Sequence, residues 1–520
     1  MTRIARALLS CTNKTGLVAF AQFLQNQNIE ILSTGGTAKT LRDAGLIVKD
    51  VAEHTGFPEM LDGRVKTLHP KIHGGFLFKR DDLNHQQQAA AHNITPIDLV
   101  VVNLYEFSQT VANPNCIFAD AIENIDIGGP AMLRSAAKNH DFVTVITDPN
   151  DYKMVQEEIA ATGNTNKNTR QRLALKVYQT TSRYDAAISE YLASTLGSEP
   201  KNFTDSIHLH LTKIQDLRYG ENPHQNAAFY KTSDTGLSTL TQHQGKELSF
   251  NNILDTEAAY RCVLEFAEPA CVIVKHNNPC GVAAADDLVT AFDNAKACDP
   301  VSCFGGVIAV NKPMTAALAQ KICETFFEVI LAPSFDAASL DIFAAKKNLR
   351  LISLVDFFTR DAHTLDVRIV SGGALVQTPD TSTEVLKKSA KPVTERVPTD
   401  TEWHDLEFVW KVAKHVKSNA IVFGKNGQTL GIGAGQMSRI DSTRIAAQKA
   451  TEAFGADCLK GSSLASDAFF PFRDGLDAAI GYGARAVAQP GGSMRDDEVI
   501  KAANENQVAM VFTGVRHFRH

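Results

Sequence analysis

The first 196 residues alternate short apolar runs with segments of helical period, and this alternation constrains the fold more than any other feature of the chain. Such a pattern is typical of βαβ units, whose parallel sheet is covered by helices. We therefore predict an α/β domain over residues 1–196. Strands are predicted at 6–10, 29–33, 99–105 and 142–147, and helices at 16–27, 37–45, 130–140 and 168–196.

A polar stretch with Gly and Pro but no periodicity follows at residues 197–205, and we predict a linker there. The chain has 520 residues, far more than one hydrophobic core usually serves. A second α/β domain is predicted over 206–520, with a break between two subdomains at 379–398, which is rich in Thr, Ser, Lys and Pro. Its clearest predicted strands are 270–275, 306–310 and 329–331.

Charge and hydropathy exclude several classes of protein. The 52 Lys plus Arg and 58 Asp plus Glu give a net charge of -6, so nothing attracts the chain generally to nucleic acid or to an anionic membrane. No apolar stretch approaches the ~20 residues of a membrane helix, and the N-terminal run is too short for a signal peptide. The nine cysteines include no Cys-x-x-Cys pair and are expected to be reduced. We expect a soluble, cytoplasmic protein.

Two loops rich in hydroxyl groups follow the first two predicted strands. Residues 10–16 read Ser-Cys-Thr-Asn-Lys-Thr-Gly and residues 33–37 read Ser-Thr-Gly-Gly-Thr, each at the start of a predicted helix. Backbone N–H groups at a helix N-terminus attract anions, and Lys14 adds a full charge. Either loop alone can be an ordinary N-cap, but parallel neighbouring strands would bring both to one sheet edge. The pair predicts a site for a phosphate monoester.

Further stretches of the first domain carry groups that suit proton transfer. Residues 63–70, Gly-Arg-Val-Lys-Thr-Leu-His-Pro, combine cations, a hydroxyl and an imidazole, although a solvated basic turn would have the same composition. Asp126 precedes two glycines and a helix that carries Lys138, and Tyr105 ends a predicted strand. A carboxylate, an ammonium and a phenol together are what general acid–base catalysis needs.

The most informative residues of the second domain are 272–281, Val-Ile-Val-Lys-His-Asn-Asn-Pro-Cys-Gly. A β-branched strand delivers Lys275 and His276 to its carboxyl end, where α/β proteins place their chemistry. Strand periodicity sends the two side chains to opposite faces, so both can serve one site only if the strand ends at Lys275. A histidine with a structural role at a strand end is the alternative.

Two patterns resemble known motifs but lack essential residues. Pro279-Cys280 begins the Pro-Cys-x-x-Cys of zinc nucleobase deaminases, but position 283 is Ala and no His-x-Glu lies upstream, so we expect no zinc site of that type. Gly-Ile-Gly-Ala-Gly-Gln at 431–436 has Gln where a dinucleotide-binding fingerprint requires its last Gly. We expect no dinucleotide site.

Polar and aromatic residues gather in several other stretches of the second domain. The stretch 466–474 combines aromatic rings with two carboxylates and can stack a flat heterocycle, although a hydrophobic loop is an equal alternative. The terminal Arg-His-Phe-Arg-His at 516–520 follows a predicted strand at 508–512 that would hold it in place. The remaining stretches with groups that pair with anions or stack on rings are 218–225, 417–419 and 436–439.

In order along the whole chain, these motifs resemble the family of bifunctional purine biosynthesis enzymes that join 5-aminoimidazole-4-carboxamide ribonucleotide (AICAR) formyltransferase to inosine monophosphate (IMP) cyclohydrolase. The resemblance implies an N-terminal parallel-sheet domain like methylglyoxal synthase and a C-terminal formyltransferase region of two cytidine-deaminase-like α/β subdomains. It rests on Asn-Lys-Thr-Gly at 13–16, Ser-Thr-Gly-Gly-Thr at 33–37, Gly-Arg-Val-Lys-Thr-Leu-His-Pro at 63–70, Asp-Ile-Gly-Gly-Pro at 126–130, Arg-Tyr-Gly-Glu-Asn-Pro-His-Gln at 218–225, Lys-His-Asn-Asn-Pro-Cys-Gly at 275–281, Asp-Pro-Val-Ser at 299–302 and Ser-Asp-Ala-Phe-Phe-Pro-Phe-Arg-Asp at 466–474.

The resemblance further implies the reactions and the residues that perform them. A formyl group passes from 10-formyltetrahydrofolate to the 5-amino group of AICAR, and the product closes to IMP with loss of water. His276 is implied as the base for the amine and Lys275 as the stabiliser of the transferred group. The residues implied to catalyse ring closure are Lys66, Tyr105, Asp126 and Lys138. Those implied to bind substrates are Ser10, Thr12, Lys14, Thr15, Ser33, Thr34, Gly35, Gly36, Thr37, Arg64, Thr67, Gly128, Arg218, Tyr219, Asn419, Arg439, Asp467, Phe469, Asp474 and Arg516.

The family pattern also implies a homodimer whose formyltransferase sites form across the interface. It implies small-molecule substrates and no catalytic metal, and the sequence leaves a bound monovalent cation open. The chain departs from the usual family residues at Thr12, Asn13 and Glu106, where relatives often carry Ser, Asp and Pro.

Two other functions are compatible with parts of the sequence. One is a regulatory protein that binds such nucleotides without turnover, but binding alone needs no proton-transfer set such as Lys275, His276 and Asp126. The other is an enzyme in which one half has degenerated. Both sets of motifs are intact, which argues against it.

Overall fold

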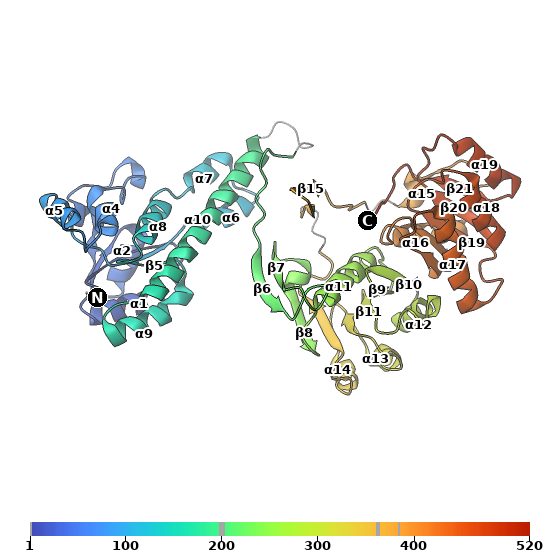
Figure 1. Ribbon diagram of the computed structural model, residues 1–520, viewed down its shortest axis with the longest axis horizontal. Coiled ribbons are helices and arrows are strands. Elements are labelled where there is room, and N and C mark those ends of the chain that lie inside the picture. Colours follow the sequence, from blue (N-terminus) through green and yellow to red (C-terminus); the bar gives the residue numbers. More distant parts are fainter. Residues whose placement is uncertain (1–2, 197–202, 360–363, 383–384) are drawn as a thin grey trace. The chain divides into compact units, whose positions relative to one another are not determined.

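The computed structural model describes residues 3–196, 203–359, 364–382 and 385–520, and the chain divides into two compact units, Met1–His210 and Leu211–His520 (Figure 1). Most of the predicted linker at 197–205 lies outside the described residues. Each unit has its own sheet and its own hydrophobic core, so we describe them separately.

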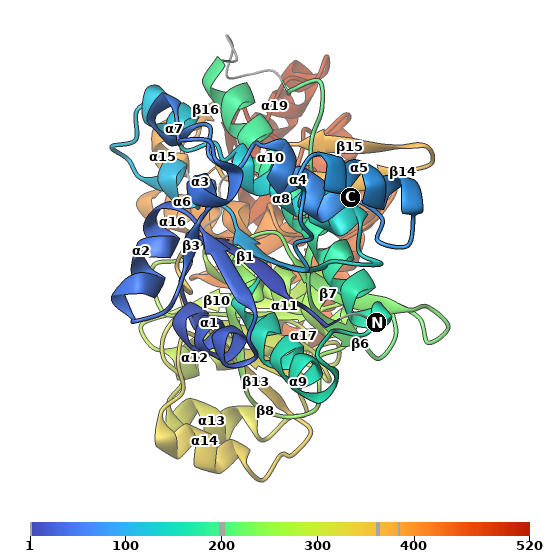
Figure 2. The same ribbon diagram turned by 90° about the vertical axis from the view of Figure 1, so that its left-hand side faces the viewer.

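Unit 1 contains a five-stranded parallel sheet in the order β3-β2-β1-β4-β5. Helices α1 and α9 lie on one side of this sheet and α8 and α10 on the other (Figure 2). The predicted parallel α/β domain is confirmed. The elements of unit 1 are β1 Arg6–Cys11, α1 Leu17–Asn26, β2 Glu30–Ser33, α2 Gly35–Asp43, β3 Lys49–Asp50, α3 Val51–Thr55, α4 Pro70–Leu77, α5 Leu83–Ala91, β4 Leu99–Asn103, α6 Phe107–Ala112, α7 Phe118–Glu123, α8 Gly128–Lys138, β5 Thr144–Ile146, α9 Tyr152–Thr162 and α10 Lys167–Leu196.

The strand order of unit 1 reverses direction at β1. From β1 the chain passes to β2 on one side, whereas β4 lies on the other side of β1. Loops that leave the carboxyl ends of such adjacent strands diverge, and ligands of open α/β sheets bind in the crevice between them. The apolar side chains of β1 and β4, such as Leu8, Leu9 and Val100, are fully buried, so this edge is held rigidly.

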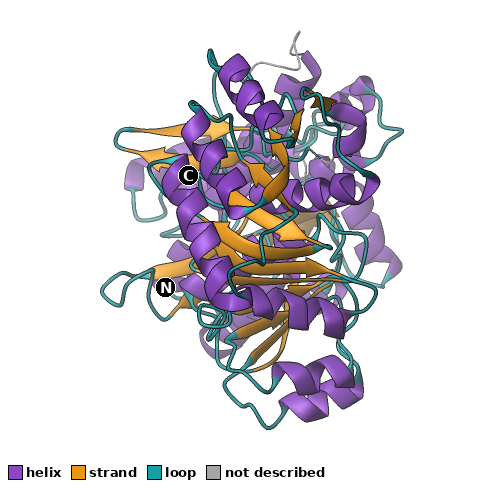
Figure 3. Ribbon diagram, turned by 90° about the vertical axis from the view of Figure 1, so that its right-hand side faces the viewer, coloured by secondary structure: helices purple, strands orange, loops and turns teal. Residues whose placement is uncertain are grey.

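Unit 2 is built on one mixed sheet of twelve strands, with the orders β16-β21-β20-β19-β17-β18 and β10-β9-β11-β12-β13-β8 joined where β18 pairs with β10. Two separate two-stranded ribbons, β6-β7 and β14-β15, complete unit 2. Figure 3 draws strands in orange and helices in purple. The elements of unit 2 are β6 Thr212–Leu217, β7 Ala227–Lys231, β8 Leu240–Gln244, α11 Phe250–Val263, β9 Ala270–Lys275, β10 Asn278–Ala284, α12 Leu288–Cys298, β11 Val307–Val310, α13 Ala316–Ile322, β12 Val329–Leu331, α14 Ala337–Phe343, β13 Arg350–Leu354, β14 Asp366–Val370, β15 Gly373–Gln377, α15 Leu386–Ser389, β16 Lys391–Pro392, α16 Asp400–Ala413, β17 Ile421–Lys425, β18 Gln428–Gly433, α17 Arg439–Phe454, β19 Ser462–Ser466, α18 Arg473–Tyr482, β20 Ala484–Gln489, α19 Asp496–Glu505 and β21 Ala509–Phe512.

The two halves of the large sheet repeat one arrangement. The sequence helix, antiparallel hairpin, helix and then three strands occurs first from α11 to β13 and again from α16 to β21. Ser249 and Thr399, the N-caps of α11 and α16, both form capping boxes and lie 150 residues apart. The break predicted at 379–398 falls between these halves, with residues 383–384 outside the described part, and the sheet continues from one half into the other.

Gly431 of the dinucleotide-like pattern, and Gly281 outside it, allow a helix to pack closely on a strand. A Cβ at Gly431 of β18 would lie 2.1 Å from the Ala446 carbonyl oxygen of α17, and one at Gly281 of β10 would lie 1.9 Å from that of Ala295 in α12. Both positions therefore require glycine, since a helix crosses each strand at close range.

All nine cysteines are free thiols. Every helix in the described ranges is too short or too polar to span a bilayer.

Candidate functional site

A pocket of about 580 Å³ opens at the carboxyl ends of β1, β2 and β4, at the reversal point of the unit 1 sheet. It brings together most of the residues predicted for this domain, from five separate stretches of the sequence. The predicted residues that line it are Ser10, Thr12, Lys14, Thr34, Gly35, Gly36, Thr37, Arg64, Lys66, Thr67, Tyr105, Asp126 and Gly128.

The loop after β1 is fixed by Asn103, the last residue of β4. Its Oδ1 accepts hydrogen bonds from the backbone N–H groups of Thr12 and Asn13 at 2.7 and 2.9 Å. Its Nδ2 donates to the Asn13 carbonyl oxygen at 2.9 Å. Sequence reasoning missed Asn103, although a polar residue at the end of an apolar strand was the available signal.

The first turn of α2 and Lys66 form a cationic side of the pocket. Thr34, Gly35 and Gly36 line it at the N-terminus of α2, where backbone N–H groups point outward. A Cβ on Gly35 would lie only 3.7 Å from the Lys66 Nζ. The same ammonium pairs with Glu59 at 2.9 Å. An ammonium beside a helix N-terminus suits a phosphate or a developing oxyanion.

Asp126 faces this cationic side from the loop before α8. Burial raises the pKa of its carboxyl above the ordinary value of 3.8, although backbone N–H groups of Gly129 and Tyr105 partly oppose the shift. The Gly129 N–H donates to Asp126 Oδ1 at 2.8 Å. The Asp126 N–H in turn donates to the Tyr184 hydroxyl of α10 at 2.7 Å. A carboxylate with a raised pKa is a better proton acceptor.

The structure differs from the predicted site at three positions of unit 1. Ser33 is fully buried and donates to the Leu9 carbonyl oxygen, so its hydroxyl stabilises the β1–β2 pair. Thr15 is exposed, and its N–H donates to Asn13 Oδ1. Lys138 is the exposed last residue of α8, whereas the pocket lies at the first turn of that helix, ~15 Å away along the axis. These three residues do not line the pocket.

Unit 2 holds a smaller pocket, of about 250 Å³, between the two halves of its sheet. Lys275 and His276 line it from the β9–β10 hairpin, and Ile445 and Lys449 line it from α17. The Lys449 ammonium forms an ion pair with Asp299, which also accepts the Ser302 N–H. The pocket thus combines two ammonium groups, an imidazole and a carboxylate.

Strand β9 ends at Lys275, so His276 lies in the turn and not on the opposite face of a strand. His276 and Asn277 are the two turn residues, with φ of 51° and 64°. The Lys275 ammonium donates to the carbonyl oxygens of Phe304 and Gly305 at 2.9 and 3.2 Å. Both side chains can therefore serve one pocket, as the sequence required for a joint role.

A buried polar cluster lies next to this pocket. The Arg439 guanidinium, on α17, forms an ion pair with Asp467 at 2.5 Å and donates to the Phe469 carbonyl oxygen at 2.9 Å. Asp467 is fully buried, so this pair stabilises the loop that carries Phe469. The Asn419 Nδ2 donates to the Gln436 carbonyl oxygen at 3.0 Å. The neighbouring Lys417 N–H donates to Asn278 Oδ1, which links the cluster to the pocket.

Eight of the ten predicted residues of unit 2 do not line the pocket. Four of them, Asn419, Arg439, Asp467 and Phe469, belong to the polar cluster just described, and the other four lie elsewhere in the unit. Arg218 and Tyr219 follow β6, and the guanidinium lies 5.6 Å from the phenol ring centroid. Asp474 is exposed in the first turn of α18, and Arg516 is exposed and stacks on Phe518.

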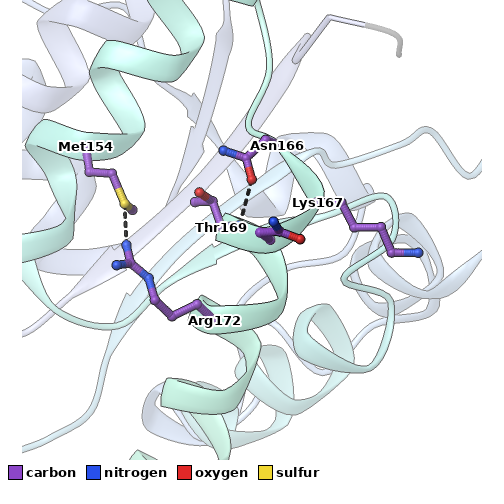
Figure 4. A pocket seen from close by; sticks show the side chains of 6 residues that line it. Met154, Asn166, Lys167, Thr169 and Arg172 are labelled. Carbon is purple, nitrogen blue, oxygen red and sulfur yellow. Dashed lines mark hydrogen bonds between the residues drawn. The ribbon is translucent and has the colours of Figure 1, made fainter.

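A third hollow, between α9 and the start of α10, contains none of the predicted residues. Arg172 contacts the Met154 sulfur there, and the Thr169 N–H donates to Asn166 (Figure 4). Lys167 is paired with Asp141 at 2.9 Å. In the part of the chain that the structure describes, no group of three or more His, Cys, Asp or Glu side chains could hold a metal ion.

Comparison with known proteins places the chain in a family. A family model described as the AICARFT/IMPCHase bienzyme matches residues 136–449, and one described as an MGS-like domain matches residues 16–131. The chain is 55% identical to a bifunctional purine biosynthesis protein PurH of Magnetococcus marinus, with all of both chains covered. Among solved structures it is similar to one described as the crystal structure of ForH, at 34% identity over 36% of this chain and 98% of that one, with a TM-score of 0.33.

Proposed function

The chain belongs to the AICARFT/IMPCHase bienzyme family and is a bifunctional enzyme, an AICAR formyltransferase and IMP cyclohydrolase of purine biosynthesis, and on this premise we propose which residues carry out each reaction. Cyclisation takes place in the unit 1 pocket and formyl transfer in the unit 2 pocket. The observation that supports this division is that each pocket gathers its own set of proton-transfer groups within its own unit.

In the unit 1 pocket the formylated nucleotide binds with its phosphate at the loop after β1 and the first turn of α2. Its carboxamide nitrogen attacks the formyl carbon, and Asp126 accepts the proton that the nitrogen loses. Lys66 and the Tyr105 phenol stabilise the oxyanion that forms on the formyl oxygen. This oxygen takes up two protons and leaves as water, while the former formamide nitrogen gives up its own proton and forms the C=N bond of the ring, so that the closed ring is IMP. A carboxamide is a poor nucleophile, so a closely held conformer supplies much of the rate.

In the unit 2 pocket the 5-amino group of AICAR attacks the formyl carbon of the donor, and His276 accepts the amine proton. Lys275 stabilises the formyl oxygen as negative charge develops on it. The bond between the formyl carbon and the donor nitrogen then breaks, and that nitrogen takes up a proton. The donor is 10-formyltetrahydrofolate, a folate-type one-carbon carrier.

The formyltransferase site is completed by a second copy of the chain. The unit 2 pocket, at about 250 Å³, is smaller than the ~300–1,000 Å³ typical of ligand pockets, although it must receive both a nucleotide and a folate. The ribbon β14–β15 exposes apolar side chains, with Ile369 82% and Leu375 63% exposed. An apolar exposed ribbon favours burial against a partner.

The nine free thiols are consistent with a reducing cytoplasm.

The assignment is tested by following AICAR and 10-formyltetrahydrofolate with the full chain and with His276→Ala. The full chain is expected to consume both and release tetrahydrofolate, and His276→Ala is expected to consume neither at a measurable rate. Unchanged consumption by His276→Ala would overturn the role of the imidazole. Sedimentation of the full chain tests the proposed dimer. A monomer at assay concentrations would overturn it.

A further inference from the structure

The turn that carries His276 lacks the glycine that its backbone favours. A two-residue hairpin with positive φ at both positions is best formed by Asn-Gly, because glycine adopts left-handed backbone angles at no steric cost, whereas side chains such as His adopt them less often. Here the two positions are His276 and Asn277, with φ of 51° and 64°. A histidine in this conformation needs support from its surroundings.

That support comes from Asp255, in the middle of α11. Its Oδ1 accepts the Asn277 N–H at 2.6 Å and its Oδ2 accepts the His276 N–H at 3.3 Å. One carboxylate thus binds both turn residues by their backbones. Burial raises the pKa of Asp255 above its ordinary value, and these two N–H donors oppose that shift.

The second half of the sheet contains the same device without the histidine. Asp405 lies 150 residues after Asp255, at the same position in α16, and its Oδ1 accepts the Gly427 N–H of the β17–β18 turn at 3.2 Å. That turn is Asn426-Gly427, with φ of 54° and 70°. The second half therefore has the sequence that favours this turn, whereas the first half has His-Asn at the same two positions, together with the equivalent carboxylate.

We propose that Asp255 is a positioning residue for formyl transfer: its carboxylate holds the His276–Asn277 backbone in the left-handed turn and so directs the imidazole toward the pocket. The proposal rests on the role given above to His276. Neither Asp255 nor Asp405 lines the pocket, so Asp255 acts through the turn.

The Asp255→Asn variant tests the proposal, because an amide retains one acceptor oxygen but presents a donor to the second backbone N–H. We expect kcat for formyl transfer to fall ~10- to 100-fold, as misplacement of a catalytic group by about 1 Å does, with a smaller change in KM for AICAR. Cyclisation of supplied formyl-AICAR by the same protein should remain at the wild-type rate. The matched control is Asp405→Asn, which loses the equivalent contact at a turn without a histidine and should retain kcat.

A second variant separates turn support from a direct charge effect. Asn277→Gly makes the turn intrinsically favourable, as Gly427 does in the second copy. Added to Asp255→Asn, it should recover a large part of the lost kcat. Wild-type kcat in Asp255→Asn, an equal loss in Asp405→Asn, or no recovery in the double variant would each overturn the proposal. Loss of activity in His276→Ala with no loss in Asp255→Asn would overturn only the positioning role, whereas an active His276→Ala would overturn the proposed base.

Discussion

Asn103 and Asn13 form a reciprocal pair, in which Asn103 Oδ1 accepts the Asn13 N–H and Asn103 Nδ2 donates to the Asn13 carbonyl oxygen, both at 2.9 Å. The end of β4 thereby fixes the loop that follows β1. This pair fixes the side of the unit 1 pocket at which we propose that the phosphate binds.

Replacement of Asn103 should therefore weaken binding at that loop. In Asn103→Ala the N–H groups of Thr12 and Asn13 lose their shared acceptor, and the loop must be ordered by the ligand instead. We expect KM for formyl-AICAR in cyclisation to rise ~10-fold, which corresponds to about one hydrogen-bonded contact. Initial rates of cyclisation measure this, and formyl transfer by the same protein is the control. An unchanged KM would contradict the role of the pair.

Asp126→Asn should affect catalysis and stability in opposite directions. Because Asp126 is the proposed proton acceptor, its replacement should reduce kcat for cyclisation by ~10²- to 10⁴-fold. Because the folded-state pKa of Asp126 lies above 3.8, the folded protein holds this proton more tightly than the unfolded chain. Stability therefore falls as the pH rises from 3.8 through the folded-state pKa, because the buried carboxyl becomes charged. Asp126→Asn avoids this charge and should melt at or above the wild-type temperature at pH 7.

The same raised pKa gives a pH dependence for the wild type. Protonation of Asp126 removes the acceptor, so cyclisation should decline on acidification at a pH above 3.8. The rate of cyclisation by the wild type, measured as a function of pH, tests this pH dependence. Thermal melting of Asp126→Asn and the wild type at pH 7 tests the expected change in stability. An acidic limb at or below the ordinary value would contradict the burial of this carboxyl.

Much of unit 1 could be predicted from its sequence because its strands are continuously apolar and its helices have clear periods. Strand β1, predicted at 6–10, occurs at Arg6–Cys11, and the predicted 168–196 helix occurs at Lys167–Leu196. The convergence of the loops after β1 and β2 followed from the neighbour rule and is observed in the pocket. Lys138 differs because spacing along a helix shows which residues share a face but not which end of it meets the pocket.

The contacts that support the proposed catalytic side chains could not be predicted from the sequence. Tyr184 is 58 residues from Asp126 in sequence, and Asp255 is 21 residues from His276. Nothing in the residue types of α10 or α11 marks these partners, since they depend on how each helix packs on its sheet. The residues Asn-Asn-Pro-Cys-Gly at 277–281 favour a turn by type, but Asn278–Ala284 forms strand β10 because it pairs with β9.

Tyr184→Phe tests the support of Asp126 from α10. The phenol accepts the Asp126 N–H at 2.7 Å and donates to the Asn124 carbonyl oxygen at 3.3 Å. Without the hydroxyl, the loop before α8 loses its hydrogen bonds to α10. We therefore expect kcat for cyclisation to fall ~3- to 10-fold with little change in KM, as loss of about one hydrogen bond would cause. Steady-state kinetics of cyclisation test this. A rise in KM alone would show that the phenol supports binding and not the carboxylate.

Asp467→Ala should destabilise unit 2, because it leaves the buried Arg439 guanidinium without its carboxylate. Removal of one partner of a buried ion pair costs about 3–5 kcal/mol. Denaturant unfolding followed with a probe in unit 2 measures the loss. The matched comparison is Arg473→Ala, which breaks an ion pair with Asp477 at the surface and should cost much less stability than Asp467→Ala. Equal losses in the two variants would contradict a structural role for the buried pair.

The central claim is that one chain contains two independent active sites, and His276→Ala tests it most directly when both reactions are measured on the same preparation. With AICAR and 10-formyltetrahydrofolate, we predict that this variant forms no IMP. When formyl-AICAR is supplied, we predict that it forms IMP at the wild-type rate. Loss of both reactions in a folded protein, or IMP formation from AICAR at the wild-type rate, would contradict the account.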